Sequence, residues 1–162
     1  MKPYFSRTTL FVLPLLLGSI STQSMAAADA ADSVSVGDPY VRAVPPGQPN
    51  SAAFMKLHNN STARHSIISA DSSVAKLIEL HTHVKEGGMM KMRQVKKIDI
   101  PSRGETVLQP GGLHVMLIGL KGGLKPGDSV SITLVFEDGS KKVIQAPVRK
   151  MKMTMDMKKR MH

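Results

Sequence analysis

The sequence predicts an all-β fold, either an antiparallel sandwich or a small barrel. Short stretches in which apolar and polar residues alternate recur along most of the chain, and such alternation is typical of half-buried strands. Turn sequences rich in Gly, Pro and Asp separate most of these stretches. No stretch after the N-terminal region keeps a helical period over three turns. Short strands at this spacing favour a two-layer antiparallel architecture.

The clearest predicted strand is 129–136, SVSITLVF, in which apolar residues alternate with serine and threonine. An Asp138-Gly139 turn follows, and 141–148, KKVIQAPV, is expected to form the second strand of a hairpin. The other candidate strands, in chain order, are 33–44, 52–59, 65–72, 75–84, 90–95, 105–109 and 113–120.

Residues 1–26 are predicted to be a secretory signal peptide. A short basic start precedes the apolar block 9–20, and small residues offer cleavage after Ala26 or Ala28. The block is shorter than the roughly 20 residues that span a bilayer, so we expect no stable membrane insertion. The chain has no cysteine, so we expect neither a lipid anchor nor disulfides. A single periplasmic domain at 27–148 is predicted, stabilised by packing alone.

The formal net charge of +10 is unevenly distributed along the chain. Residues 27–140 carry 12 basic and 11 acidic residues, whereas 141–162 carry eight basic residues and one acidic residue. The body is therefore nearly neutral and has few aromatic residues, which argues against a nucleic-acid partner. No Ser/His/Asp set, phosphate-binding loop or converging pair of carboxylates indicates an enzyme.

Histidine and methionine recur at alternate positions in three of the predicted strands. Side chains two residues apart on a strand share a face. The residues on the faces opposite the expected core are Glu79, His81 and His83 in 75–84, Met90 and Met92 in 90–95, and His114 and Met116 in 113–120. Three segments thus present imidazole or thioether groups away from the core.

Imidazole combined with thioether is a chemically narrow donor set. Thioether sulfur is soft and neutral, a poor ligand for Zn²⁺, Mg²⁺ or Ca²⁺ and a good one for Cu(I). A blue-copper electron-transfer site requires a cysteine thiolate, which this chain lacks. Two imidazoles and two thioethers therefore favour the reversible carriage of Cu(I).

The other histidines and methionines have simpler interpretations. His58 and His65 are interpreted as ordinary polar surface residues of strands, and Met55 as a packing residue. His83 is left open as an alternative ligand, a partner of a ligand or an exposed side chain. Met90 is an accessory candidate beside the principal set.

The spacing of the principal set, His81-x10-Met92-x21-His114-x-Met116, resembles the signature of the periplasmic copper chaperones called PCuAC, formerly a domain of unknown function. The flanking sequences ELHTHVKEGGMMKMRQV, QPGGLHVMLIGL and YVRAVPPGQPNSAAFMKLHNNS are also similar. The resemblance covers 34–148. The methionine that usually follows the first His region in this family is replaced here by Lys85 or its neighbours.

The resemblance implies a cupredoxin-like β-barrel that binds one Cu(I) through the four residues of that signature. It also implies delivery of copper towards the Cu(A) centre of cytochrome c oxidase. The implied partners are the copper-bearing subunit of the oxidase and a Sco-type thioredoxin-like protein. We expect a monomeric metallochaperone. The alternatives are a periplasmic copper buffering or resistance protein without a dedicated oxidase target, and a copper-dependent oxidase or reductase.

The segment 149–162 is predicted to be a flexible tail, because methionine is its only apolar residue type. Its accessory metal candidates are Met151, Met153, Met155, Met157, Met161 and His162. The first four occupy alternate positions, so we expect the tail to capture Cu(I) and to raise its concentration near the core site. The imidazole of His162, beside the terminal carboxylate, is a candidate for holding Cu(II).

Overall fold

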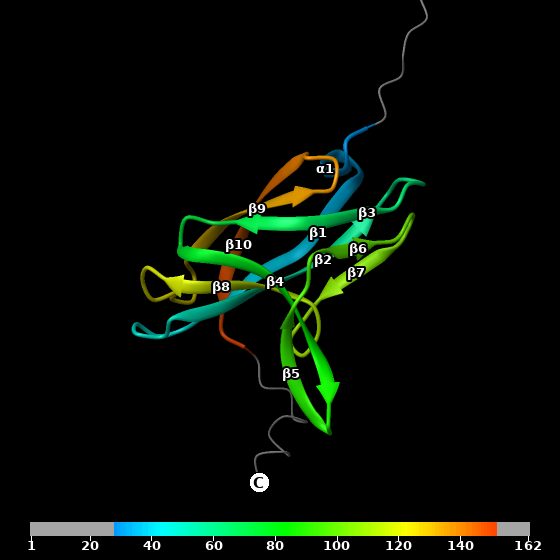
Figure 1. The fold of residues 1–162 in the computed structure, drawn as a ribbon. Helices are drawn as coiled ribbons and strands as arrows, with labels where there is room; N and C mark the ends of the chain where they lie inside the picture. Colours follow the sequence, from blue (N-terminus) through cyan, green and yellow to red (C-terminus); the bar gives the residue numbers. More distant parts are fainter. Residues whose placement is uncertain (1–27, 152–162) are drawn as a thin grey trace, which may run out of the picture.

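The computed structural model describes residues 28–151, and most of them lie in strands (Figure 1). Its elements are α1 (Ala30–Ser33), β1 (Val34–Arg42), β2 (Asn50–Asn59), β3 (His65–Asp71), β4 (Ala75–Glu86), β5 (Met89–Gln94), β6 (Ile98–Ile100), β7 (Glu105–Leu108), β8 (His114–Leu120), β9 (Ser129–Phe136) and β10 (Lys141–Arg149). Every predicted strand is present, which confirms the all-β prediction. The predicted signal peptide, 1–26, and all but the first three residues of the predicted tail, 149–162, lie outside the described residues. Within 28–151, no helix is long and apolar enough to cross a membrane.

Hydrogen bonds join the strands in the order β5-β4-β8-β2-β1-β10-β9-β3-β6, with β7 paired to β2. Neighbours pair in antiparallel fashion except β1 and β10, which run parallel at Val41–Val148 and Arg42–Arg149. This parallel contact differs from the purely antiparallel arrangement that was predicted. Strand β1 forms a long antiparallel pairing with β2, and β10 forms one with β9. Strands β1 and β10 pair with each other only through their final two residues.

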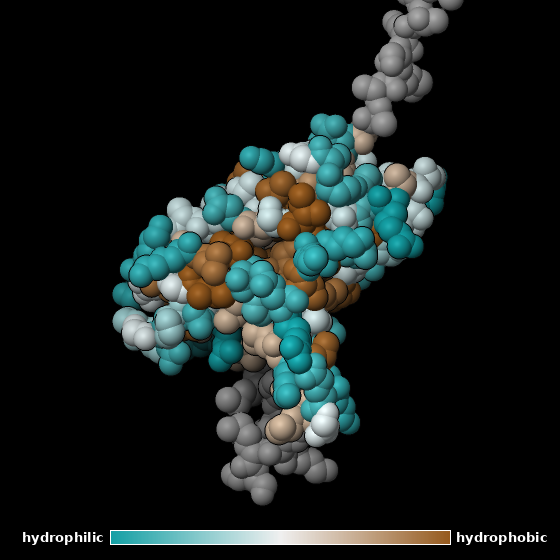
Figure 2. Space-filling model, viewed as in Figure 1, coloured by the Kyte–Doolittle hydropathy of each residue, from teal (hydrophilic) through white to brown (hydrophobic). Residues whose placement is uncertain are grey.

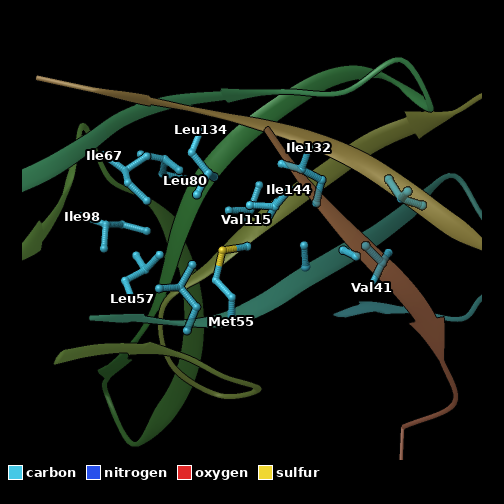
Figure 3. Close-up of a cluster of buried hydrophobic side chains, with 14 of the residues drawn as sticks. Val41, Met55, Leu57, Ile67, Leu80, Ile98, Val115, Ile132, Leu134 and Ile144 are labelled. Carbon is cyan, nitrogen blue, oxygen red and sulfur yellow. The ribbon is translucent and has the colours of Figure 1, made fainter. Parts of the chain in front are cut away.

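The hydrophobic core draws its side chains from both halves of this strand order. Figure 3 shows Met55 of β2, Leu80 of β4, Val115 of β8 and Ile132 of β9 directed into one cluster. Each of these side chains is at most 3% exposed. Burial of one such side chain stabilises the fold by about 1.5–3 kcal/mol. Met55 is therefore a packing residue, as predicted.

The short helix α1, which the sequence did not predict, is held by the turn between β9 and β10. The backbone N–H of Ala30 donates to Oδ2 of Asp138 at 2.7 Å, and that of Ala31 donates to Oγ of Ser140 at 2.9 Å. The hydrogen bonds from Ala30 and from the Ser140 side chain lower the pKa of Asp138 to about 2. The predicted Asp138-Gly139 hairpin turn thus also anchors the start of the described chain.

The hairpin formed by β4 and β5 projects beyond the body (Figure 1). All six residues of β5 are exposed, so this strand lies outside the core. On the body itself, Figure 2 shows hydrophobic side chains at the surface over β3 and β4, and the large exposed apolar residues of these strands are Ile68 and Leu77.

Candidate metal site

Strands β4, β5 and β8 bring the predicted ligands onto one face of the sheet. His81 of β4 pairs with His114 of β8, and His83 of β4 pairs with Met92 of β5. Met116 lies two residues after His114 and is therefore on the same face. Directly paired residues have side chains close enough to interact. The structure therefore brings together every member of the principal set, together with His83.

The turn between β4 and β5 sets this register. Gly87 and Gly88 form the two-residue connection, with φ values of +58° and +82°. Two residues at positive φ match the turn type that suits the twist of a hairpin, and glycine adopts it without steric cost. Glu86 then pairs with Met89, and the count along both strands places Met92 opposite His83 rather than His81.

The imidazole of His114 is almost fully buried, at 2% exposure. Its Nδ1 lies 3.0 Å from the carbonyl oxygen of Gly112, which can only accept, so Nδ1 carries the proton and Nε2 keeps its lone pair. The Phe54 ring lies 6.2 Å away between centroids. Burial lowers the pKa of His114, the Gly112 hydrogen bond opposes this, and the rings of His83 and His81 lower it further. The neutral ring that a metal requires is therefore favoured.

The imidazole of His81 is held by a carboxylate on its own strand. Its Nε2 lies 2.7 Å from Oε2 of Glu79. Because an ionised carboxylate only accepts, Nε2 donates this hydrogen bond, and in the neutral ring the lone pair lies on Nδ1. Nδ1 of His81 is buried and has no hydrogen-bond partner among the described residues. A buried polar atom without a partner is costly, and a metal ion would satisfy it.

A cavity of about 340 Å³ opens beside these rings. The nitrogen and sulfur ligand candidates on its wall are His83, Met92, His114, Met116 and Met151. Its other lining residues are Arg42, Asn50, Ser51, Ala52, Phe54, Pro110 and Gly111. His81 does not line this cavity, although its ring centroid is 5.8 Å from that of His114. The ring of His83 is slightly nearer to His114, at 5.2 Å.

The donor types around the cavity restrict the ion that could bind. Among the described residues, no group of three or more His, Cys, Asp or Glu side chains is placed to hold a metal. Beside imidazole nitrogen, the cavity wall offers the thioether sulfurs of Met92 and Met116. Neutral soft donors of this kind fit Cu(I) and fit Zn²⁺, Mg²⁺ or Ca²⁺ poorly.

The remaining candidate residues lie elsewhere. Met90 pairs with Lys85 towards the tip of the hairpin, is 57% exposed, and does not line the cavity. His58 is exposed, as predicted. The predicted surface position of His65 is wrong: its ring is buried, with Ser61 Oγ at 3.0 Å and Glu137 Oε1 at 2.7 Å. Apart from Met151, the predicted tail ligands Met153, Met155, Met157, Met161 and His162 lie outside the described residues.

Sequence reasoning placed Glu79 on the same face as the histidines but did not identify it as the partner of His81. The i, i+2 spacing of Glu79 and His81 on a strand was the available signal. The contact of His114 with Phe54 had no such signal, because the Phe54 ring comes from a different strand.

Comparison with known proteins identifies similar sequences. The family model described as "LpqE-like: Putative lipoprotein LpqE-like" matches residues 34–148. "Putative lipoprotein Lxx21020" of Leifsonia xyli subsp. xyli (strain CTCB07) is 37% identical over 120 residues, which make up 74% of this chain and 71% of that protein.

Two solved structures are similar to this chain. The solution structure of CuI-DR1885 from Deinococcus radiodurans is 40% identical, with a TM-score of 0.61 and coverage of 76% of this chain and 82% of that one. The copper-bound PCuAC domain from PmoF2 has a TM-score of 0.64 at 22% identity, over 76% of this chain and 97% of that one. At this identity, the second likeness is evidence of the fold alone. Together they confirm the predicted cupredoxin-like fold.

Proposed function

This chain belongs to the LpqE-like, PCuAC-type family, and from that premise we propose that it is an exported metallochaperone that carries one Cu(I). The ligands are His81, Met92, His114 and Met116. Copper is the cargo of the protein: it is bound, carried and released without being chemically changed. DR1885, at 40% identity, has a solved CuI form, which supports the choice of metal.

The observation that carries this proposal is the buried Nδ1 of His81, which has no hydrogen-bond partner within residues 28–151. The Glu79 hydrogen bond leaves its lone pair free, and the Gly112 hydrogen bond does the same for Nε2 of His114. In the neutral rings these two hydrogen bonds fix the tautomer, so that one nitrogen of each imidazole keeps a free lone pair on a face that also carries two thioethers. Carboxylate or carbonyl partners of this kind are how proteins orient metal-binding histidines.

The same donor set suits release as well as binding. All four ligands are neutral, and no thiolate is present to hold copper very tightly or to be oxidised. Met92 lies on the projecting hairpin and is 45% exposed, so the ligands of a partner could displace it first. His114 is almost fully buried and would release the ion last. A carrier needs this graded accessibility, whereas an enzyme would need an open coordination position for substrate.

The acceptor that we propose is the Cu(A) centre of cytochrome c oxidase. The partner would be the copper-bearing subunit of the oxidase or a Sco-type thioredoxin-like protein. The carrier would act as a monomer in the periplasm. The basic start and apolar block of residues 1–26 support export through a cleaved signal peptide. The relative from Leifsonia xyli is named a putative lipoprotein, which also supports export.

A second candidate function is the buffering of periplasmic copper without a dedicated acceptor. The methionines at alternate positions from Met151 to Met157 favour it, because they offer binding capacity beyond a single site. A strain that lacks the gene would separate the two functions. Loss of Cu(A) oxidase activity at normal copper tolerance supports delivery, whereas copper sensitivity with normal oxidase activity supports buffering.

The biochemical test is an anaerobic Cu(I) titration against a chromogenic chelator. We expect one tightly bound equivalent that is lost in His114→Ala. The matched control is His58→Ala, which removes an exposed histidine from a neighbouring strand and should leave the tight equivalent in place. A tight equivalent that survives in His114→Ala would refute the proposed core site.

A further inference from the structure

Met151, the last described residue, lines the same cavity as the candidate ligands. Met92 and Met116 reach the cavity wall from β5 and β8, whereas Met151 reaches it from beyond the end of β10. Met151 is partly buried there. We propose that Met151 is a further ligand of the core site, which exchanges with Met92. This inference rests on the proposed function.

The end of β10 is fixed at the rim of the cavity. Arg149 pairs with Arg42, which itself lines the cavity. The guanidinium of Arg149 lies 2.7 Å from Oδ1 of Asp38 and 5.4 Å from the centroid of the Tyr40 ring. Such an ion pair and cation–π contact restrain the side chain of Arg149. Met151 follows only two residues after Arg149, so the restrained Arg149 holds the backbone just before Met151 beside the cavity.

The described part of the cavity wall holds more donors than one Cu(I) requires. It carries the thioethers of Met92, Met116 and Met151 and the imidazoles of His83 and His114. A spare sulfur allows one thioether to replace another at the ion: the bond from copper to Met151 sulfur forms, and the bond to Met92 sulfur breaks. No electron or proton is transferred, because both ligands are neutral thioethers. Met92 is the ligand to be replaced, since it is 45% exposed on the projecting hairpin.

The sequence after Met151 continues with methionine at every second position, at Met153, Met155 and Met157. Met151 is the first of this row and lies within the cavity. These three methionines carry the same thioether group as Met151. Every donor in the row therefore belongs to the same soft ligand class.

The test observes the methionine methyl groups directly by nuclear magnetic resonance. The protein with its complete C-terminal segment carries ¹³C-methyl methionine and is titrated anaerobically with Cu(I). We expect the Met151 methyl signal to shift together with those of Met92 and Met116 up to one equivalent. Met151→Leu assigns that signal and should lower the Cu(I) affinity by about tenfold, the scale of losing one supporting group of a metal site.

The control is Met153→Leu, which makes the same substitution at the next methionine and should retain wild-type affinity. The inference is overturned if Met92 and Met116 shift at one equivalent while Met151 does not. It is also overturned if Met153→Leu lowers the affinity as much as Met151→Leu, because the effect would then belong to the whole segment. In both cases the proposed function stands. If no methionine methyl shifts at one equivalent, the proposed function is refuted together with this inference.

Discussion

Oε2 of Glu79 lies 2.7 Å from Nε2 of His81, and Glu79 is also paired across the sheet with Met116. One carboxylate therefore orients the imidazole of one proposed ligand and lies beside the thioether of another. The carboxylate fixes the tautomer of His81. Its negative charge also offsets the positive charge of a bound monovalent ion, which the neutral ligands cannot do.

We predict that Glu79→Gln weakens Cu(I) binding by about tenfold to a hundredfold, as loss of the hydrogen-bond partner of a ligating histidine typically does. The amide removes the charge and no longer imposes one tautomer on His81. An anaerobic competition titration measures the effect. Glu105→Gln, at an exposed acidic residue of β7, is the control and should bind as the wild type does. Equal affinity in both variants would show that His81 is not oriented by Glu79.

Met55 and Met116 lie in different environments, so the same substitution should have opposite effects at the two positions. Met55 is a 2% exposed core residue, whereas Met116 lines the cavity. Met55→Leu should change the free energy of unfolding by less than about 1.5 kcal/mol and leave Cu(I) binding unchanged. Met116→Leu should lower the Cu(I) affinity by about tenfold or more, equivalent to at least about 1.4 kcal/mol. Chelator competition and thermal unfolding on both variants check the pair, and a Met116→Leu protein of wild-type affinity would remove Met116 from the ligand set.

The Gly87-Gly88 turn should control metal binding without contributing to the core. Gly88 has a φ of +82°, so Gly88→Ala forces a side chain into a left-handed conformation at a cost of about 1–2 kcal/mol. We expect faster amide exchange in β5 and weaker Cu(I) binding, because Met92 would lose its fixed position opposite His83. Gly122→Ala is the control, since Gly122 has open space around it and no positive φ. Unchanged affinity in Gly88→Ala would mean that the turn does not position Met92.

Stability in acid should depend on Glu137, which does not line the cavity. Burial alone would raise the pKa of Glu137, but hydrogen bonds from the Ser66 backbone and the His65 side chain lower it below its ordinary value of 4.5. The unfolded state therefore binds the proton more readily than the folded state does. The stabilisation is complete above the ordinary pKa, and it is lost as the pH falls through the lowered pKa.

We accordingly expect the wild-type unfolding temperature to decrease as the pH is lowered below about 4.5. Glu137→Gln should be less stable at neutral pH by about 1–3 kcal/mol, and its unfolding temperature should vary less across this acidic range. Thermal unfolding recorded as a function of pH measures both effects. An acid dependence as steep in Glu137→Gln as in the wild type would assign it to other carboxylates.

Much of the fold was predictable because the alternation of apolar and polar residues is local. Strand β9 illustrates this: its buried residues Val130, Ile132, Leu134 and Phe136 are the four that the alternation selects. Strand β6 was missed because its three residues are too short to show a period. Helix α1 was missed because it depends on Asp138, which is 108 residues away in the chain.

The sequence by itself determined the chemistry of the candidate site: imidazole and thioether at alternate positions, with no thiolate, define a soft neutral donor set. It also determined the shared face, because the period of a strand follows from backbone geometry. The tertiary structure alone decided that Met92 lies opposite His83 and that His81 does not line the cavity. It also decided that Met151 reaches the cavity wall. The reason is that strand register and the parallel contact of β1 with β10 depend on pairing between distant segments, which no local pattern specifies.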